Sequence, residues 1–302
     1  MPWQDLFNEE SLTVTDVSPT VRQRELGLRL RKIRGGLGLT VEDVARKLMC
    51  SPAKVSRMET GARRPILRDI RELCSIYSLD ERVSAELMQL ARQAREPIWW
   101  NKHDEAELVP YIGLEQDASS LTAYSLYYLP ALLQTEDYAR ELVRAIHPKI
   151  EQDVLEQRVQ TRLRRQQRLA GDNPPRYSAL VDEAVFHRKV GSSALMAAQV
   201  DKVLSLAEDG KVVVQLIPFD RGVYPAADIM FVLLEFTQLP PIVFVEGLVE
   251  SQHFDRPDQI GRYQAAIERI RDSALNPQDS LHRLAEIRKG YDAGGGKHAG
   301  LL

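Results

Sequence analysis

Residues 44–65 read VARKLMCSPAKVSRMETGARRP and carry the signals of a short basic helix with a defined start and end. Ser51 stands before Pro52, the order of an N-cap and a first helical residue, because that position leaves an N–H unbonded and proline has none. Gly61 is typical of a residue that ends a helix. We therefore predict one helix between Ser51 and Gly61 and a second, preceding helix that begins at Thr40.

Helical patterns continue on both sides of this pair. Ser18-Pro19 opens a helix with apolar residues at helical spacing, and Gly35-Gly36 ends it. Two more helices are expected over about residues 67–77 and 80–95. The stretch 19–96 is therefore predicted to be a five-helix domain without strands.

The charge of the chain is unevenly distributed. Residues 21–71 hold 14 Lys/Arg against 5 Asp/Glu, a net charge of +9, whereas the whole chain carries −3. A compact basic segment in an otherwise acidic chain favours a polyanionic partner for that segment. The alternative is a solvated helical surface without such a partner.

Two short helices joined by a tight turn form the unit that places its second helix in the major groove of DNA. On the helix after Ser51, Arg57 can bond the O6 and N7 atoms of guanine, and Ala53 can meet a thymine methyl group. The N–H groups at the helix start near Thr40 can bind a phosphate, and the basic residues after Gly61 can contact the phosphates of the DNA backbone. The predicted DNA contacts are Thr40, Val41, Ser51, Pro52, Ala53, Lys54, Ser56, Arg57, Arg63 and Arg64.

The same stretch resembles the recognition unit of the lambda-repressor-like, or XRE-type, helix-turn-helix proteins. The resemblance implies a DNA-binding domain in which Glu59 forms a structural pair with Arg34 of the first helix. One departure is Met49, which stands where the turn of this family often has glycine. The matching positions are Ala45, Ser51, Val55, Ser56, Met58, Glu59 and Gly61.

The second half of the chain has a mixed pattern. We expect residues 107–290 to form an α+β domain of helices around a small sheet of about four strands, so that the whole chain is mainly α. Residues 1–18 are expected to be a flexible arm, 97–106 a linker and 291–302 a disordered tail. Helices are predicted over 107–119, 134–146, 151–170, 193–208, 257–273 and 278–290, and strands over 176–184, 211–219, 228–236 and 241–247.

This half is similar to the C-terminal domain of actinobacterial WhiJ-like XRE regulators, a domain of unknown function. LTAYSLYYLPALLQTEDYARELV (121–143) and VVVQLIPFDRGVYPAADIMFVLLEF (212–236) carry much of the resemblance, which extends over about residues 107–288. Such regulators are often encoded beside small acidic proteins that oppose or modulate them, in some cases in a toxin–antitoxin-like arrangement. The resemblance therefore implies an antitoxin-like role with a small acidic partner protein.

The residues of the second half indicate no catalytic or metal site. Its histidines are scattered, both cysteines lie outside it, and neither a GxSxG nor a P-loop motif occurs. Asp182-Glu183 is either an acid pair or a helix N-terminus. Arg158, Arg162 and Arg165 either contact phosphates or an acidic partner, or belong to a solvated helix face. We expect a protein that is not an enzyme and that needs no cofactor or metal.

The sequence also allows predictions of the cellular compartment and the oligomeric state. The chain shows no signal peptide and no apolar run of membrane-spanning length, so we expect a cytoplasmic protein that joins the nucleoid when it binds DNA. One recognition helix reads only a few base pairs, so we expect a homodimer on paired half-sites. The sequence predicts a DNA-binding transcriptional repressor whose C-terminal domain dimerises or binds the acidic partner. The alternative is that this domain senses a small-molecule effector in a pocket between the sheet and its helices.

Overall fold

The computed structural model describes residues 18–97, 109–247 and 251–293 of the chain. The chain divides into two compact units, residues 1–101 and 102–302. The arm predicted over 1–18 and the linker over 97–106 lie outside the described residues except for Ser18 and Pro97. Of the disordered tail predicted over 291–302, residues 291–293 are helical and the rest lies outside the described residues. No helix in the described ranges is both long enough and apolar enough to cross a membrane.

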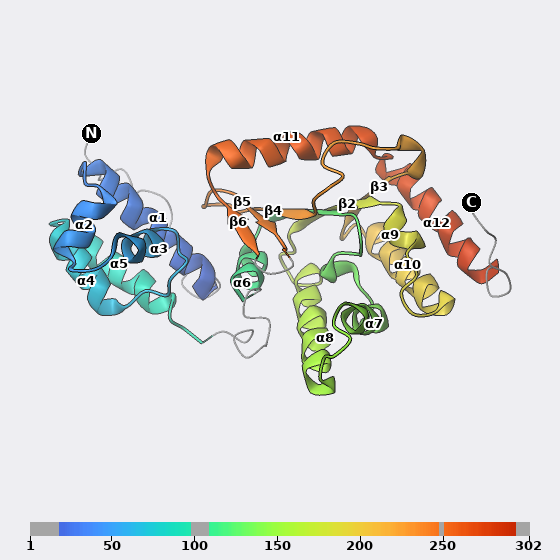
Figure 1. Ribbon diagram of the computed structural model, residues 1–302, viewed down its shortest axis with the longest axis horizontal. Coiled ribbons are helices and arrows are strands. Elements are labelled where there is room, and N and C mark those ends of the chain that lie inside the picture. Colours follow the sequence, from blue (N-terminus) through green and yellow to red (C-terminus); the bar gives the residue numbers. More distant parts are fainter. Residues whose placement is uncertain (1–17, 98–108, 248–250, 294–302) are drawn as a thin grey trace. The chain divides into compact units, whose positions relative to one another are not determined.

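The N-terminal unit contains the five predicted helices (Figure 1). Its core is formed by apolar side chains from all five, among them Leu26, Val44, Val55, Ile70 and Leu87, each at most 2% exposed. The helices are α1 (Pro19–Gly36), α2 (Val41–Lys47), α3 (Pro52–Glu59), α4 (Leu67–Ile76) and α5 (Glu81–Gln93).

Side-chain caps fix where these helices begin. Ser18 Oγ accepts a hydrogen bond from Val21 N at 3.3 Å at the start of α1. Ser51 Oγ does the same for Lys54 N at 3.3 Å, with Pro52 as the first residue of α3. These hydroxyls satisfy N–H groups that have no partner within the helix, which is why the capping residues predicted the helix starts correctly.

Two glycines let α1 and the end of α3 approach closely. A Cβ atom on Gly27 would lie 2.7 Å from the carbonyl oxygens of Met58 and Glu59, so only glycine fits. Gly61 adopts φ +68°, and a Cβ atom there would lie 3.0 Å from Arg24 Cα. The orientation of α3 on α1 therefore depends on both glycines.

The C-terminal unit is built on a six-stranded mixed sheet in the order β3-β2-β1-β4-β5-β6. The strands β1, β2 and β3 are parallel, and β4, β5 and β6 continue from β1 as antiparallel neighbours. The strands are β1 (Ser120–Ser125), β2 (Arg176–Asp182), β3 (Val213–Ile217), β4 (Phe231–Glu235), β5 (Ile242–Val245) and β6 (Gln252–Phe254).

Helices cover both faces of this sheet. α11 runs along one face, and α7 and α8 lie on the other (Figure 1). α12 packs against α10 and β3. The helices are α6 (Val109–Asp117), α7 (Glu136–Ile146), α8 (Gln152–Gln166), α9 (Ala184–His187), α10 (Ser193–Glu208), α11 (Pro257–Ser273) and α12 (Pro277–Ala293), with short 3₁₀ turns η3 (Ala131–Leu133), η4 (Gln167–Leu169) and η5 (Phe219–Arg221).

The α+β class is confirmed, but the sheet has six strands where about four were expected. The prediction missed β1 and β6. β1 is central, and all six of its residues are buried, so its sequence SLTAYS lacks the alternation that marks a half-exposed strand. β6 is only three residues long, too short for a periodic signal.

Candidate nucleic-acid interface

α3 presents one polar face to solvent. Its first residues Pro52 and Ala53 are exposed, as are Ser56 and Arg57 one turn later. On the opposite side Val55 and Met58 are 1% and 5% exposed and hold the helix to the core. Of the residues predicted to contact DNA on this helix, Pro52, Ala53, Ser56 and Arg57 face solvent, whereas Lys54 is only partly exposed.

The basic residues around this face are not equivalent. Arg57 is exposed and Arg63 is half-buried, and neither guanidinium has a side-chain partner among the described residues. Arg64 is exposed, but its Nη2 donates to the carbonyl oxygens of Arg95 and, at 3.2 Å, of Glu96. Arg57 and Arg63 are thus the freest of the predicted cationic contacts to meet DNA.

Lys54 is already engaged within the fold. Its Nζ lies 2.7 Å from Asp69 Oδ2 in the first turn of α4. The two side chains are only 21% and 13% exposed. This ion pair links α3 to α4 on the edge of the exposed face.

The start of α2 places a negatively charged side chain in its first turn. Thr40 is the N-cap and forms a capping box with Asp43, in which Thr40 N donates to Asp43 Oδ2 at 3.0 Å and Asp43 N donates to Thr40 Oγ1 at 3.1 Å. The hydrogen bonds from Thr40 lower the pKa of Asp43, so the carboxylate is charged at neutral pH. A phosphate at Val41 would therefore bind beside an anion that Arg46 only partly screens at 3.4 Å.

Arg34 and Glu59 form the pair implied by the family resemblance. Arg34 Nε lies 2.6 Å from Glu59 Oε1, and its Nη2 lies 2.9 Å from Oε2. Arg34 Nη1 also donates to Leu39 O at 2.7 Å, in the loop before α2. Hydrogen bonding to Glu59 raises the pKa of Arg34, which remains charged. One guanidinium thus ties α1, the loop before α2 and the end of α3 together.

The arginines of α8 do not form the surface that was predicted. Arg165 is 5% exposed, and its Nε and Nη2 lie 2.7 and 2.8 Å from the two oxygens of Glu115 in α6. Both alternatives given for Arg165, a contact with phosphates or an acidic partner and a place on a solvated helix face, are therefore wrong. Arg165 stands four residues before Leu169, which is 3% exposed, and this spacing places both on the same buried side of the predicted helix. That spacing could have indicated from the sequence that Arg165 is buried. Arg162 is half-buried and donates to Arg158 O at 3.0 Å.

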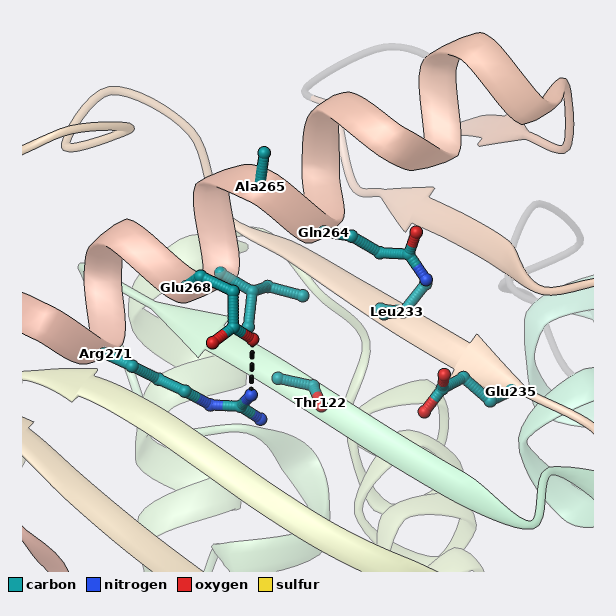
Figure 2. Close-up of a pocket in the computed structure, with 8 residues that line it drawn as sticks. Thr122, Leu233, Glu235, Gln264, Ala265, Glu268 and Arg271 are labelled. Carbon is teal, nitrogen blue, oxygen red and sulfur yellow. Dashed lines mark hydrogen bonds and ion pairs between the residues drawn. The ribbon is translucent and has the colours of Figure 1, made fainter.

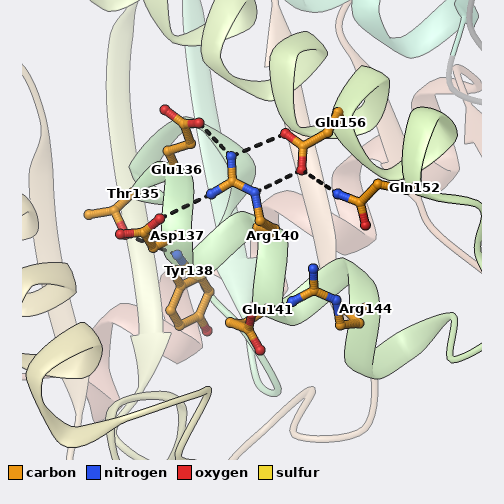
Figure 3. Close-up of polar contacts among 9 residues, drawn as sticks. All are labelled: Thr135, Glu136, Asp137, Tyr138, Arg140, Glu141, Arg144, Gln152 and Glu156. Carbon is orange, nitrogen blue, oxygen red and sulfur yellow. Dashed lines mark hydrogen bonds and ion pairs between the residues drawn. The ribbon is translucent and has the colours of Figure 1, made fainter.

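Acidic side chains on α7 and α8 converge on one cation (Figure 3). Arg140 Nη2 lies 2.5 Å from Glu136 Oε1, and its Nε lies 2.9 Å from Glu156 Oε1 on the neighbouring helix. Asp137 and Gln152 complete the group. The cluster therefore cross-links two helices, and its three carboxylates outnumber the single guanidinium, so it is a net acidic surface and does not attract an acidic partner.

The acidic pair after β2 is also engaged by the protein itself. Asp182 Oδ1 accepts from Ala184 N at 2.8 Å at the start of α9, and its Oδ2 accepts from Tyr224 Oη at 2.6 Å. Glu183 is fully buried, and its carboxylate accepts from Arg283 Nε at 3.0 Å and from Phe219 N at 3.2 Å. This pair holds the start of α9, the connection between β3 and β4, and α12 together.

An open cleft lies between α11 and the sheet (Figure 2). Thr122 of β1 and Glu235 of β4 line its floor, and Gln264, Glu268 and Arg271 of α11 line its wall. Arg271 Nη1 donates to Glu268 Oε1 at 2.8 Å. The cleft offers charged groups of both signs beside a few apolar atoms.

Comparison with known families assigns both units. Residues 25–87 match the model of a helix-turn-helix domain of the XRE-like kind, and residues 108–286 match a domain of unknown function, DUF5753. The chain belongs to the DUF5753 family. No curated protein matches it. Since a helix-turn-helix domain precedes the DUF5753 domain, this family member is a DNA-binding regulator.

Proposed function

We propose that this DUF5753 protein is a sequence-specific transcriptional repressor that reads its operator with α3. The observation that carries the proposal is the solvent-facing surface of α3, where the Arg57 guanidinium has no side-chain partner among the described residues. A guanidinium held on a fixed helix can grip guanine with two parallel hydrogen bonds. Ala53, also exposed, suits a thymine methyl group on the same face.

Residues outside the exposed face of α3 position the protein on the DNA duplex. Arg63 follows α3 and supplies a charge to the phosphate backbone, whereas the Arg34–Glu59 pair fixes the angle of α3 without touching DNA. The chain acts as a homodimer on two half-sites, because one α3 reads too few base pairs to select an operator in a genome.

The C-terminal unit has a regulatory, non-enzymatic role in this proposal. It dimerises the protein or binds a small acidic protein encoded nearby, in an antitoxin-like arrangement. Support for the partner comes from the resemblance to WhiJ-like regulators. Because Arg165 is buried against Glu115, docking of that partner relies on other basic side chains. Co-expression with the acidic proteins encoded beside the gene tests this part, and it fails if none co-purifies in a stable complex.

Genomic footprinting followed by gel shift tests the DNA-reading proposal. Arg57→Ala is expected to lose about 1–3 kcal/mol of preference for the operator over random duplex. Arg63→Ala is the matched control, since it removes the same side chain from a backbone position and is expected to weaken both duplexes equally. Unchanged operator preference in Arg57→Ala overturns the assignment of α3 as the reading helix.

A second candidate role is sensing of a small-molecule effector by the C-terminal unit. The cleft between α11 and the sheet supports it, because Glu235 has no side-chain partner among the described residues and Arg271 stands on the same cleft. Groups of opposite charge in one cleft suit a zwitterionic metabolite. Thermal-shift screening of such metabolites against wild type and Glu235→Gln tests this role. A stabilising ligand whose effect survives Glu235→Gln binds elsewhere.

A further inference from the structure

The ion pair between Lys54 and Asp69 distinguishes Lys54 from Arg57, the other cation on α3. Lys54 lies beside the exposed Ala53 in the first turn of the reading helix, among the residues predicted to contact DNA. Its Nζ instead lies 2.7 Å from Asp69 Oδ2. Arg57, one turn further along the same helix, has no such acidic neighbour among the described residues.

The environment of the pair makes it stronger than an ordinary surface ion pair. Asp69 Oδ2 is shielded from water and accepts no hydrogen bond from the described residues, so it depends on the charge of Lys54; the two side chains are only 21% and 13% exposed. Exposed pairs contribute about 0–1 kcal/mol because water screens them, whereas a sheltered carboxylate that loses its cation is left without compensation. If Lys54 left Asp69 to bind a phosphate, the free energy lost with the ion pair would therefore offset much of the free energy gained from the new contact.

The place of Asp69 in α4 supports the same conclusion. Asp69 stands in the first turn of α4, whose N-cap residue Ile66 provides no side-chain cap. A carboxylate there interacts favourably with the positive end of the helix. Asp69 thus presents a carboxylate that faces α3 from an adjacent helix.

We propose that Asp69 withholds Lys54 from the DNA backbone and so limits sequence-independent binding. The inference rests on the proposed DNA-binding function and adds a residue that sets specificity without contacting a base. Each phosphate that a protein neutralises adds about 0.9 to the slope of log K against log salt. Withholding one lysine weakens binding to any duplex, whereas the contacts of Arg57 with bases are unaffected.

Salt titration of the full chain on a mixed-sequence duplex tests the proposal. Fluorescence anisotropy is measured between about 50 and 200 mM salt for wild type, Lys54→Met, Asp69→Asn and the double variant. Glu81→Gln is the matched control, because Glu81 is an exposed acid in the first turn of α5 and also has no side-chain hydrogen-bond partner among the described residues. Circular dichroism shows whether each variant is folded.

The expected pattern has three parts. Lys54→Met keeps the wild-type slope, Asp69→Asn steepens it by about 0.9 beyond any change in Glu81→Gln, and the double variant returns to the wild-type slope. A flatter slope in Lys54→Met means that Lys54 already contacts phosphate and overturns the inference. An Asp69→Asn effect that persists without Lys54 overturns it as well. If wild type shows no salt-dependent binding to DNA, the proposed function itself fails.

Discussion

Arg34 and Glu59 form a two-point ion pair, with Nε–Oε1 and Nη2–Oε2 distances of 2.6 and 2.9 Å, between α1 and the last residue of α3. Glu59 is 5% exposed, whereas the side chain of Arg34 is 16% exposed. Glu59 therefore depends on the ion pair more than Arg34 does, because its buried carboxylate cannot be solvated by water when Arg34 is removed. The pair holds the end of α3 that lies away from the reading residues Pro52 and Ala53.

Arg34→Met is expected to destabilise the N-terminal unit by about 3 kcal/mol, because it leaves the Glu59 carboxylate buried and uncompensated. Glu59→Gln is expected to cost less, since Arg34 retains its bond to Leu39 O and some access to water. Hydrogen exchange of α1 and α3 peptides measures both effects, because it reports local opening free energies in a chain of two units. Equal losses in the two variants would contradict the assignment of Glu59 as the more buried partner.

The turn between α2 and α3 carries strain that glycine would remove. Met49 adopts φ +48° and is 92% exposed, so its side chain makes little contact that could offset the left-handed backbone. Met49→Gly is expected to stabilise the N-terminal unit by about 0.5 kcal/mol, after the entropy that glycine loses on folding. Met49→Ala keeps the Cβ atom and is expected to give no gain. Thermal melts of the three proteins compare them, and a gain in both variants would place the cause in the side chain of Met49.

Local sequence signals were sufficient for the N-terminal unit. Caps such as Ser51-Pro52 and Thr40-Asp43 determine helix starts through contacts within three residues, so they can be recognised without a structure. The partition of α3 into a buried and an exposed face follows from helical spacing in the same way. The five helices and the candidate reading face could therefore be predicted.

Local sequence signals could not predict the contacts between residues that are far apart in the chain. Lys54 and Asp69 meet only because α3 and α4 pack together, and Arg165 meets Glu115 across fifty residues of sequence. β1 is a strand because it pairs with β2 and β4 on either side. Its own six residues are all buried, so their sequence shows no alternation that would identify a strand. The sequence therefore identified which residues are basic, while the fold decided which of them are available.

Acid unfolding of the C-terminal unit is expected to depend on Glu183. Burial tends to raise the pKa of this carboxyl group, but hydrogen bonds led by that from Arg283 outweigh burial and lower it. A lowered pKa means that Glu183 contributes stability above its unfolded pKa of about 4.3, and that this contribution is lost as pH falls toward the folded pKa. The folded unit should therefore lose stability below about pH 4.

Arg283→Met removes the leading hydrogen bond and leaves burial to dominate. The pKa of Glu183 then rises, so the acid-unfolding midpoint is expected at a higher pH, with a loss of about 2 kcal/mol at neutral pH. Arg271→Met is the matched control, because its partner Glu268 is 69% exposed and the pair is screened by water. Far-ultraviolet circular dichroism against pH measures both. A similar shift in the two variants would show that Glu183 is not the titrating group.

Gly27 is expected to be the position in α1 least tolerant of a methyl group. The added Cβ atom would lie 2.7 Å from the carbonyl oxygens of Met58 and Glu59, and since these are backbone atoms, α3 itself must move. Gly27→Ala is expected to cost about 1–3 kcal/mol and to weaken operator binding, because the reading face moves with α3.

Gly35→Ala provides the control within the same helix, since no atom beyond the adjoining backbone of α1 lies within 4 Å of its Cβ position. There alanine is expected to stabilise the helix by about 0.5–1 kcal/mol through its higher helix propensity. Calorimetry of both variants, together with gel shifts on the operator, separates the two effects. If Gly27→Ala is as stable as wild type and binds the operator equally well, the close approach of α1 to α3 does not set the position of the reading helix.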